Sequence, residues 1–160
     1  MSAKRSVPWR VIAALAVVAA LAGLIGALIV RGRPVPDGPV AVVWNHQACA
    51  HCRMSVGDPA YAAQLVTRDG DVAFFDDPGC LLHYLDDRAP EVHRVWFHDS
   101  TSDRWLSDAE VGFMTATAGT PMGYGLAAVP AATPGAIDLG LARRRLTAGL
   151  ATDGHHRSAP

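Results

Sequence analysis

The sequence predicts an α+β domain preceded by a single transmembrane helix, on three observations. Residues 11–30 consist only of Val, Ile, Leu, Ala and Gly, and an apolar run of about 20 residues spans the hydrocarbon core of a bilayer. Beyond it, several short strand patterns are separated by turn signals. A helix pattern at residues 76–88 lies between two of these strands. Strands and helices in this order are typical of the α+β class.

The apolar run has the features of an anchor. A cleaved signal peptide has a shorter apolar core followed by small residues, whereas this run ends in Arg31-Gly32-Arg33. A lipoprotein needs a cysteine directly after the run, and the first cysteine here is Cys49. The basic flank at residues 1–10 carries three positive charges and residues 31–39 carry two. The positive-inside rule therefore predicts that the body lies on the extracytoplasmic side.

The charge of the remaining chain argues against nucleic-acid binding. Residues 34–160 carry nine basic and 15 acidic side chains, and binding to nucleic acid needs cationic charge to displace counterions. Three cysteines are also too few for a scaffold built from disulfides. The body is therefore expected to be a globular domain with an apolar core.

The first half of the body is predicted to form a linker, a strand, a loop and a hairpin. Residues 31–39 are rich in Pro and Gly and predict a stiff, extended linker. Residues 40–44 predict a strand and residues 49–59 a loop. The hairpin is expected from strands at residues 61–67 and 72–75, which are separated by the turn dipeptide Asp-Gly.

A helix is expected directly after this hairpin. Asp76 or Asp77 can accept hydrogen bonds as its N-cap, and Pro78 suits its first position. The apolar pattern continues to Arg88, and Pro90 ends it.

The second half of the body predicts more strands and a final helix. The expected strands lie at residues 92–98, 104–106, 114–117 and 124–129. Apolar positions repeat at helical spacing over residues 136–150, which predicts a C-terminal amphipathic helix. Residues 151–160 are expected to form a disordered tail.

Four donors lie within six residues of the predicted loop: Cys49, His51, Cys52 and Met54. Thiolate and thioether ligands favour Cu(I), whereas imidazole suits both copper and zinc. Met54 discriminates between these metals, because a thioether adds little to a zinc site or to dithiol redox chemistry. The competing interpretation of Met54 is a core packing residue. The group as a whole predicts a Cu(I) site.

Other uses of the cysteine pair are disfavoured or stay open. A c-type haem needs His directly after the second cysteine, where this chain has Arg53. Structural zinc needs four ligands, and only Cys80 and isolated histidines remain to supply them, so zinc is disfavoured. Asp58-Pro59 breaks the helix that a thioredoxin-like site would need. Outside the cytoplasm the two thiols can instead form a disulfide.

Two further residues are candidate ligands. Cys80 is either a small buried apolar residue or a third sulfur donor. Met122 lies in a Gly-rich loop, where it can close over a metal or cover the edge of the core. His83 is expected to face solvent. The sequence contains no phosphate loop, no nucleophile elbow and no paired catalytic carboxylates, which favours metal binding and transfer over catalysis.

Four segments in this order resemble the NosL family, the accessory copper-binding proteins of nitrous oxide reductase. They are Cys49-Ala-His-Cys-Arg-Met54, Tyr61-Ala-Ala-Gln64, Phe75-Asp-Asp-Pro-Gly-Cys80 and Thr120-Pro-Met-Gly-Tyr-Gly125. The resemblance implies a copper-binding domain over residues 40–135 that is built from two small ββαβ units. It also implies an extracytoplasmic Cu(I) chaperone, not an enzyme, whose client is a copper enzyme such as nitrous oxide reductase.

The family's Cys-x-Met element corresponds to Cys52 and Met54, and its Met-Gly element to Met122 and Gly123. Family members are typically lipoproteins, and many have one cysteine at the first motif, whereas this chain has an apolar run and the additional Cys49.

We therefore expect Cys52, Met54 and Met122 to be the primary Cu(I) ligands, with Cys49 and then His51 or Cys80 completing a low-coordinate site. The alternatives are a membrane-tethered thiol–disulfide oxidoreductase and a disulfide-stapled interaction module.

Overall fold

The computed structural model describes residues 8–31 and 34–153. The chain divides into two compact units, Met1–Pro34 and Val35–Pro160, which are considered separately below. The predicted basic flank lies mostly outside the described residues, as does the tail from residue 154 onward.

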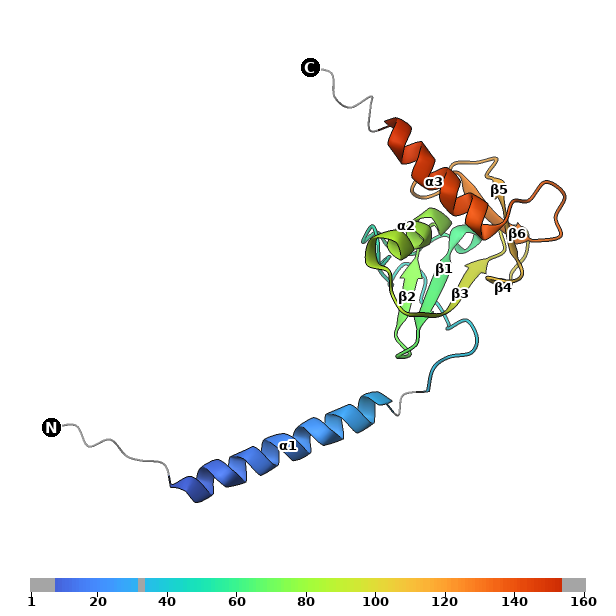
Figure 1. The fold of residues 1–160 in the computed structure, drawn as a ribbon. Helices are drawn as coiled ribbons and strands as arrows, with labels where there is room; N and C mark the ends of the chain where they lie inside the picture. Colours follow the sequence, from blue (N-terminus) through green and yellow to red (C-terminus); the bar gives the residue numbers. More distant parts are fainter. Residues whose placement is uncertain (1–7, 32–33, 154–160) are drawn as a thin grey trace, which may run out of the picture. The chain divides into compact units, whose positions relative to one another are not determined.

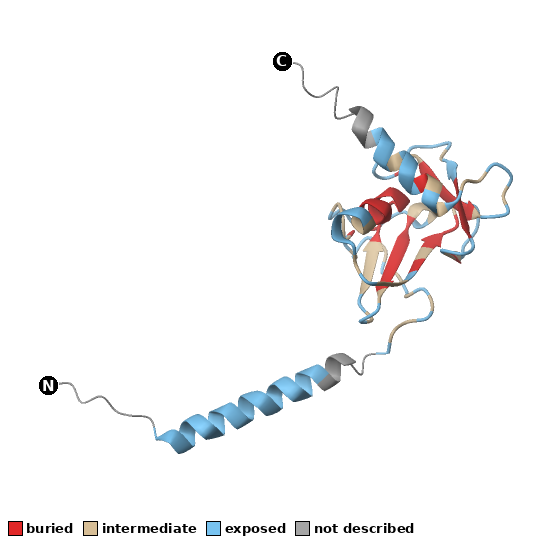
Figure 2. Ribbon diagram, viewed as in Figure 1, coloured by how far each residue is buried: buried red, intermediate tan, exposed pale blue. Residues whose placement is uncertain are grey.

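The first unit is the helix α1, Trp9–Arg31 (Figure 1). Its 23 residues rise about 34 Å at 1.5 Å each, so the helix is long and apolar enough to cross a membrane. All of its described side chains are exposed, as the pale blue ribbon in Figure 2 shows. An apolar helix in the core of a soluble domain would instead be covered by other parts of the chain.

The second unit is an α+β body, which confirms the predicted fold class. A four-stranded antiparallel sheet has the order β2-β1-β3-β4, and a second sheet pairs β5 with β6. The strands are β1 (Ala63–Thr67), β2 (Val72–Phe75), β3 (Val92–His98), β4 (Trp105–Ser107), β5 (Val111–Thr115) and β6 (Leu126–Pro130). The helices of the body are the single 3-10 turn η1 (Pro59–Tyr61), α2 (Pro78–Arg88) and α3 (Leu139–Asp153).

The elements β1, β2, α2 and β3 form one ββαβ unit. The hairpin turns at Asp69-Gly70, where Gly70 has a φ of 85° that suits glycine. The described part of the second half has the order β5, β6, α3, without a further strand after the helix. The bridge between Phe113 and Ile137 adds a short third chain segment beside β5.

Helix α2 begins and ends where its sequence predicts. The carboxylate of Asp77 caps it by accepting a hydrogen bond from the Gly79 amide at 2.8 Å, and Pro78 occupies the first turn. Ala89 adopts the left-handed conformation with a φ of 43°, and Pro90 follows. Only the first half of the helix is buried, so the residues from Pro78 to His83 face the core.

The apolar core lies between the two sheets and α2, where Figure 2 shows most of β1 and the first half of α2 as buried. The rings of Phe97 and Phe113 meet edge to face at 5.0 Å and so connect the sheets. Helix α2 packs against β1, β2, β6 and α3. An ion pair between Arg143 and Asp86 joins α3 to α2.

The prediction of a strand at residues 40–44 is wrong. The backbone of Val40 is bound by a buried side chain instead of a neighbouring strand: its N–H donates to Gln64 Oε1 at 2.8 Å, and its carbonyl accepts from Gln64 Nε2 at 2.7 Å. A glutamine side chain can satisfy both backbone hydrogen-bonding groups of one residue in this way, which sheet periodicity does not reveal.

The second hairpin and the last helix are displaced from their predicted bounds. β5 begins at Val111 and not at 114, because Gly112 lies against Ala131 and Ala136, where a Cβ would be only 2.9 Å from the Ala136 Cβ. β6 begins after Gly125, whose φ is 70°. α3 continues to Asp153, so the first residues of the predicted tail are helical.

Candidate metal centre

The loop that carries the first donors is closed by its own backbone. The Cys49 amide donates to the Met54 carbonyl at 2.7 Å, and the Arg53 amide donates to the Cys49 carbonyl at 3.1 Å. Arg53 turns the chain with a φ of 69°, and Ala48 and Ser55 form a bridge across the loop. The Ala50 amide donates to the Phe74 carbonyl at 2.8 Å, which anchors the loop beside β2.

The remaining donors come from the junction of β2 and α2. Asp76 follows the last residue of β2, and Cys80 lies in the first turn of α2. Because Asp77 and not Asp76 caps the helix, the Asp76 carboxylate is left to face the cysteine loop. Asp76 is 2% exposed and Cys80 is fully buried.

The two segments bring four potential ligands together: Cys49, Cys52, Asp76 and Cys80. One ligand atom from each lies within 4.8 Å of all the others. Cys52 Sγ donates to Asp76 Oδ1 at 3.3 Å. Cys49 and Cys80 are fully buried, whereas Cys52 is half-buried, so the cluster is most open at Cys52. All three cysteines are free thiols.

Hydrogen bonds and burial shift the pKa values of the three thiols in different directions. A hydrogen bond from the Cys80 thiol, together with the backbone amides of Cys52 and Asp76, lowers the pKa of Cys49 to about 6. Burial, first of all, raises the pKa of Cys52 to about 11. The hydrogen bond to Cys49, followed by burial, raises the pKa of Cys80. Cys49 is therefore the thiol that loses its proton most readily, and metal binding must remove the protons of the thiols that bind.

The loop that carries Met122 is attached to the beginning of α2. The Met122 amide donates to Asp77 Oδ2 at 3.1 Å. The ring of Tyr124 lies against Gly79 so closely that a Cβ at Gly79 would be 2.3 Å from the Tyr124 Cδ2. Asp77 thus binds the helix with one carboxylate oxygen and the Met122 loop with the other.

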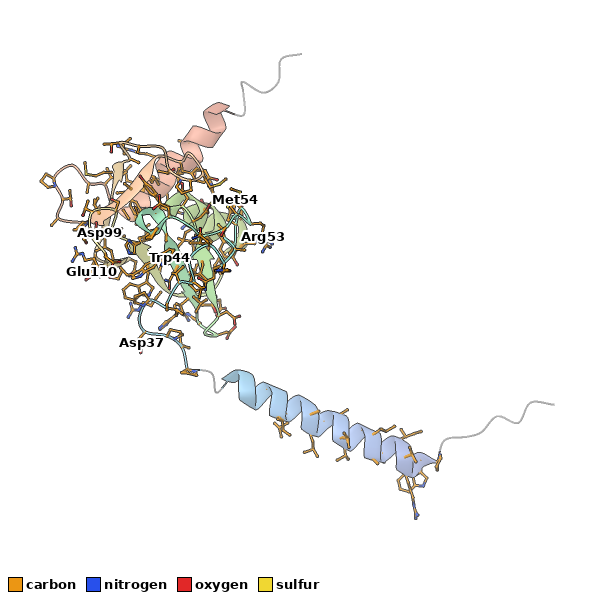
Figure 3. The ribbon with its side chains drawn as sticks, turned by 180° about the vertical axis from the view of Figure 1, so that it is seen from behind. Asp37, Trp44, Arg53, Met54, Asp99 and Glu110 are labelled. Atoms are coloured by element: carbon orange, nitrogen blue, oxygen red, sulfur yellow. The ribbon has the colours of Figure 1, made fainter. Side chains whose placement is uncertain are left out.

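Both candidate methionines have accessible thioethers. Met54 is 57% exposed, so it is not a core packing residue. Met122 is 36% exposed, which is compatible both with closing over a metal and with covering the edge of the core. Met54 and Arg53 lie at the surface of the body in Figure 3. The role of both thioethers as metal ligands stays a prediction.

The predicted exposure of His83 is wrong, and His51 is not one of the four clustered donors. The His83 ring is 8% exposed, stacks on His51 at 5.7 Å, and meets Tyr124 at 4.9 Å. Burial lowers the pKa of His83, which therefore stays neutral at pH 7. His51 Nδ1 lies 3.8 Å from Asp87 Oδ2. Through these ring contacts His83 connects His51 of the cysteine loop with Tyr124 of the Met122 loop.

Asp76 is the site residue that the sequence analysis missed. It was one of two adjacent candidates for the helix cap, and the choice between them was open. The available signal was the spacing, since Asp76 precedes Cys80 by about one helical turn. This spacing suggests that the two side chains lie on the same side of the helix start. It does not show which other segment of the chain packs against that side.

Fold and site together define a small α+β protein with a buried cluster of three thiols and one carboxylate that can bind a metal ion. No protein-family model and no curated protein sequence matches the chain. Among solved structures, the chain is similar to the copper chaperone NosL from Shewanella denitrificans, with 15% identity and a TM-score of 0.47. The match covers 69% of this chain and 87% of that protein. That protein belongs to the family that the four sequence segments resemble.

Proposed function

We propose that this chain is a membrane-anchored, extracytoplasmic chaperone that binds Cu(I) and passes it to a copper enzyme. The observation that carries the proposal is the convergence of three thiol sulfurs from two segments within 4.8 Å. Thiolates neutralise and shield Cu(I), which prefers soft ligands and low coordination numbers. Because hydrogen bonds lower the pKa of Cys49, its thiolate forms most readily and is the favoured first ligand.

The accessible donors suit transfer. Cys52 is half-buried, and the thioethers of Met54 and Met122 are exposed on the two neighbouring loops. A partner's ligands can displace these outer donors one at a time while the buried Cys49 still holds the metal. Stepwise exchange of this kind avoids releasing free Cu(I).

The proposal also includes a membrane anchor, α1, and a client enzyme that receives the copper. α1 is long and apolar enough to hold the body at a membrane, and the basic N-terminal flank favours an extracytoplasmic body. The four motif segments favour nitrous oxide reductase, or its assembly machinery, as the client.

An anaerobic Cu(I) titration tests this function. The full chain, reduced and in detergent, is titrated against a chromophoric Cu(I) chelator. We expect one equivalent to bind with sub-nanomolar affinity and Cys52→Ser to weaken binding strongly. Met54→Leu and Met122→Leu should weaken it moderately, while Met114→Leu, at a methionine of similar exposure to Met122, serves as the control. Failure of the wild-type chain to compete with the chelator would refute the proposal.

The thiol–disulfide oxidoreductase is the second candidate, favoured by the low pKa of Cys49. Its weakness is access, because the nucleophilic sulfur of such an enzyme must reach a substrate disulfide, and Cys49 is fully buried. Reduction of insulin disulfides by the full chain, at a rate above that of a Cys49→Ser variant, would favour the enzyme.

A further inference from the structure

A pocket of about 800 Å³ lies between β5, α3 and the Met122 loop, and its lining includes none of the four clustered donors. Five apolar side chains supply much of its wall: Phe113, Met114, Leu126, Ile137 and Leu146. Sites for small molecules have volumes of about 300–1,000 Å³ and apolar walls with a few polar groups. The space is much larger than one inserted side chain needs, so it suits a whole small molecule.

The backbone keeps this space open. Gly123 and Gly135 lie in two different loops and have φ values of 74° and 85°, which favour glycine over residues with a side chain. Nothing lies within 4 Å of the position that a Cβ would occupy at either residue. Because both positions favour glycine, no side chain from these two loop positions fills the pocket.

One wall of the pocket contains a buried histidine with an unused hydrogen-bonding atom. His83 is 8% exposed, and its Nε2 atom is buried without a hydrogen-bond partner among the described residues. Leaving a buried polar atom unpaired costs free energy, which a ligand can recover. Burial lowers the pKa of His83, and the neutral ring can donate or accept one hydrogen bond at Nε2. The charges of Asp77, Asp86 and Asp87 act on this ring, so a neutral polar group suits it better than an anion.

A second polar group of the pocket is a cation. Arg145 of α3 is exposed, and it is the only charged side chain among the described residues that line the pocket. It forms no ion pair with another described residue, whereas Arg143 of the same helix pairs with Asp86. A guanidinium binds a carboxylate through two parallel hydrogen bonds. The lining therefore favours an anionic group at Arg145.

We propose that this pocket binds a small apolar carboxylate, with its apolar body between β5 and α3, its anionic group at Arg145 and an uncharged polar group at His83. The positive lining differs from the rest of the body, in which acidic side chains outnumber basic ones. The copper function proposed above does not require such a ligand, so the inference goes beyond that function and does not depend on it.

Photo-crosslinking of the reduced, metal-free full chain in a nonionic detergent tests this site. The probe is para-benzoylbenzoate, which has two apolar rings, a neutral carbonyl and a carboxylate, and which reacts with nearby C–H bonds under near-ultraviolet light. Peptide mass spectrometry locates the labelled residues. We expect saturable labelling at Met114, Met122 or Leu146 that excess para-phenylbenzoate suppresses. Labelling of α1 is the reference for probe dissolved in the micelle and should rise without saturation.

Two substitutions separate the polar contacts from general apolar binding. Arg145→Gln should raise the probe concentration for half-maximal labelling about 2- to 5-fold, as expected for an exposed ion pair. Arg144→Gln, at the neighbouring exposed arginine outside the pocket lining, is the matched control. The methyl ester of the probe should show no difference between the wild-type and Arg145→Gln chains. His83→Phe keeps an aromatic ring but removes Nε2, and it should weaken labelling about 5-fold.

Thr115→Trp keeps the test decisive if His83→Phe does not fold. Thr115 is an exposed residue of β5 that lines the pocket, and strands accept aromatic residues, so the larger side chain should fill the space and abolish saturable labelling. Labelling that never saturates, that saturates equally in Thr115→Trp, or that Arg145→Gln leaves unchanged would overturn the inference. Because these measurements use the metal-free chain, such a failure leaves the copper function standing, and a failed Cu(I) titration does not affect this pocket.

Discussion

Replacing Gly79 with alanine tests how tightly the Met122 loop packs against α2. An added Cβ would lie 2.3, 2.4 and 2.7 Å from the Cδ2, Cγ and Cβ atoms of Tyr124. Carbon atoms in normal contact are about 3.5–4.0 Å apart, so the tyrosine must move by more than about 1 Å. Overpacking of this kind costs about 1–3 kcal/mol.

Helix propensity acts in the opposite direction. In a helix interior, alanine is about 1 kcal/mol more favourable than glycine, and Gly79 lies in the first turn of α2. We therefore expect Gly79→Ala to lower the free energy of unfolding by up to about 2 kcal/mol. Because the movement of Tyr124 displaces the loop, the Cu(I) affinity should fall as well if Met122 is a ligand.

Urea denaturation of the full chain in detergent measures this effect. The double variant Gly79→Ala/Tyr124→Ala removes the two closest contacts, so its loss should be smaller than the sum of the single losses. Gly119→Ala, in the preceding part of the same loop, meets nothing within 4 Å and is the control. A Gly79→Ala chain more stable than the wild type, or a double variant whose loss equals the sum of the single losses, would refute the packing argument.

Three further outcomes follow from the described contacts. Cys80→Ala removes the thiol that donates to Cys49, so the pKa of Cys49 should rise above about 6. In a pH titration the thiolate absorbance should then appear at a higher pH than in the wild type, and an unchanged midpoint would contradict the hydrogen bond. Gln64→Ala leaves the Val40 peptide unit without its buried partner and should cost about 1–3 kcal/mol of unfolding free energy, whereas no loss would mean that water replaces the side chain. Burial of Asp99 would by itself raise its pKa, but hydrogen bonds from Thr101, Ser102 and Arg104 outweigh it and lower the pKa. The carboxylate therefore stabilises the fold above its unfolded pKa near 3.8, and this stabilisation is lost as the pH falls through the lower folded value. The deficit of Asp99→Asn relative to wild type should thus be full at pH 7 and shrink in acid, and a deficit independent of pH would contradict this assignment.

Local chemistry made much of the fold predictable. The apolar run, the Asp-Gly turn and the Asp-Pro start of α2 each act through neighbours in sequence, and the corresponding elements lie at or near their predicted positions. The failures have tertiary causes. Residues 40–44 satisfy their backbone through Gln64, which is distant in sequence, and β5 includes Gly112 because residues 131 and 136 approach it.

For the candidate metal centre, the sequence by itself determined that Cys49, Cys52 and Met54 lie close together, since they belong to one short loop. Only the tertiary structure decided that Cys80 and Asp76 join the cysteine pair. The reason is that Asp77 uses both carboxylate oxygens, one to cap α2 and one to hold the Met122 loop. This turns its neighbour Asp76 toward the thiols, and no local pattern distinguishes two adjacent aspartates. Cys80 and Asp76 therefore come next to the cysteine pair through tertiary packing alone.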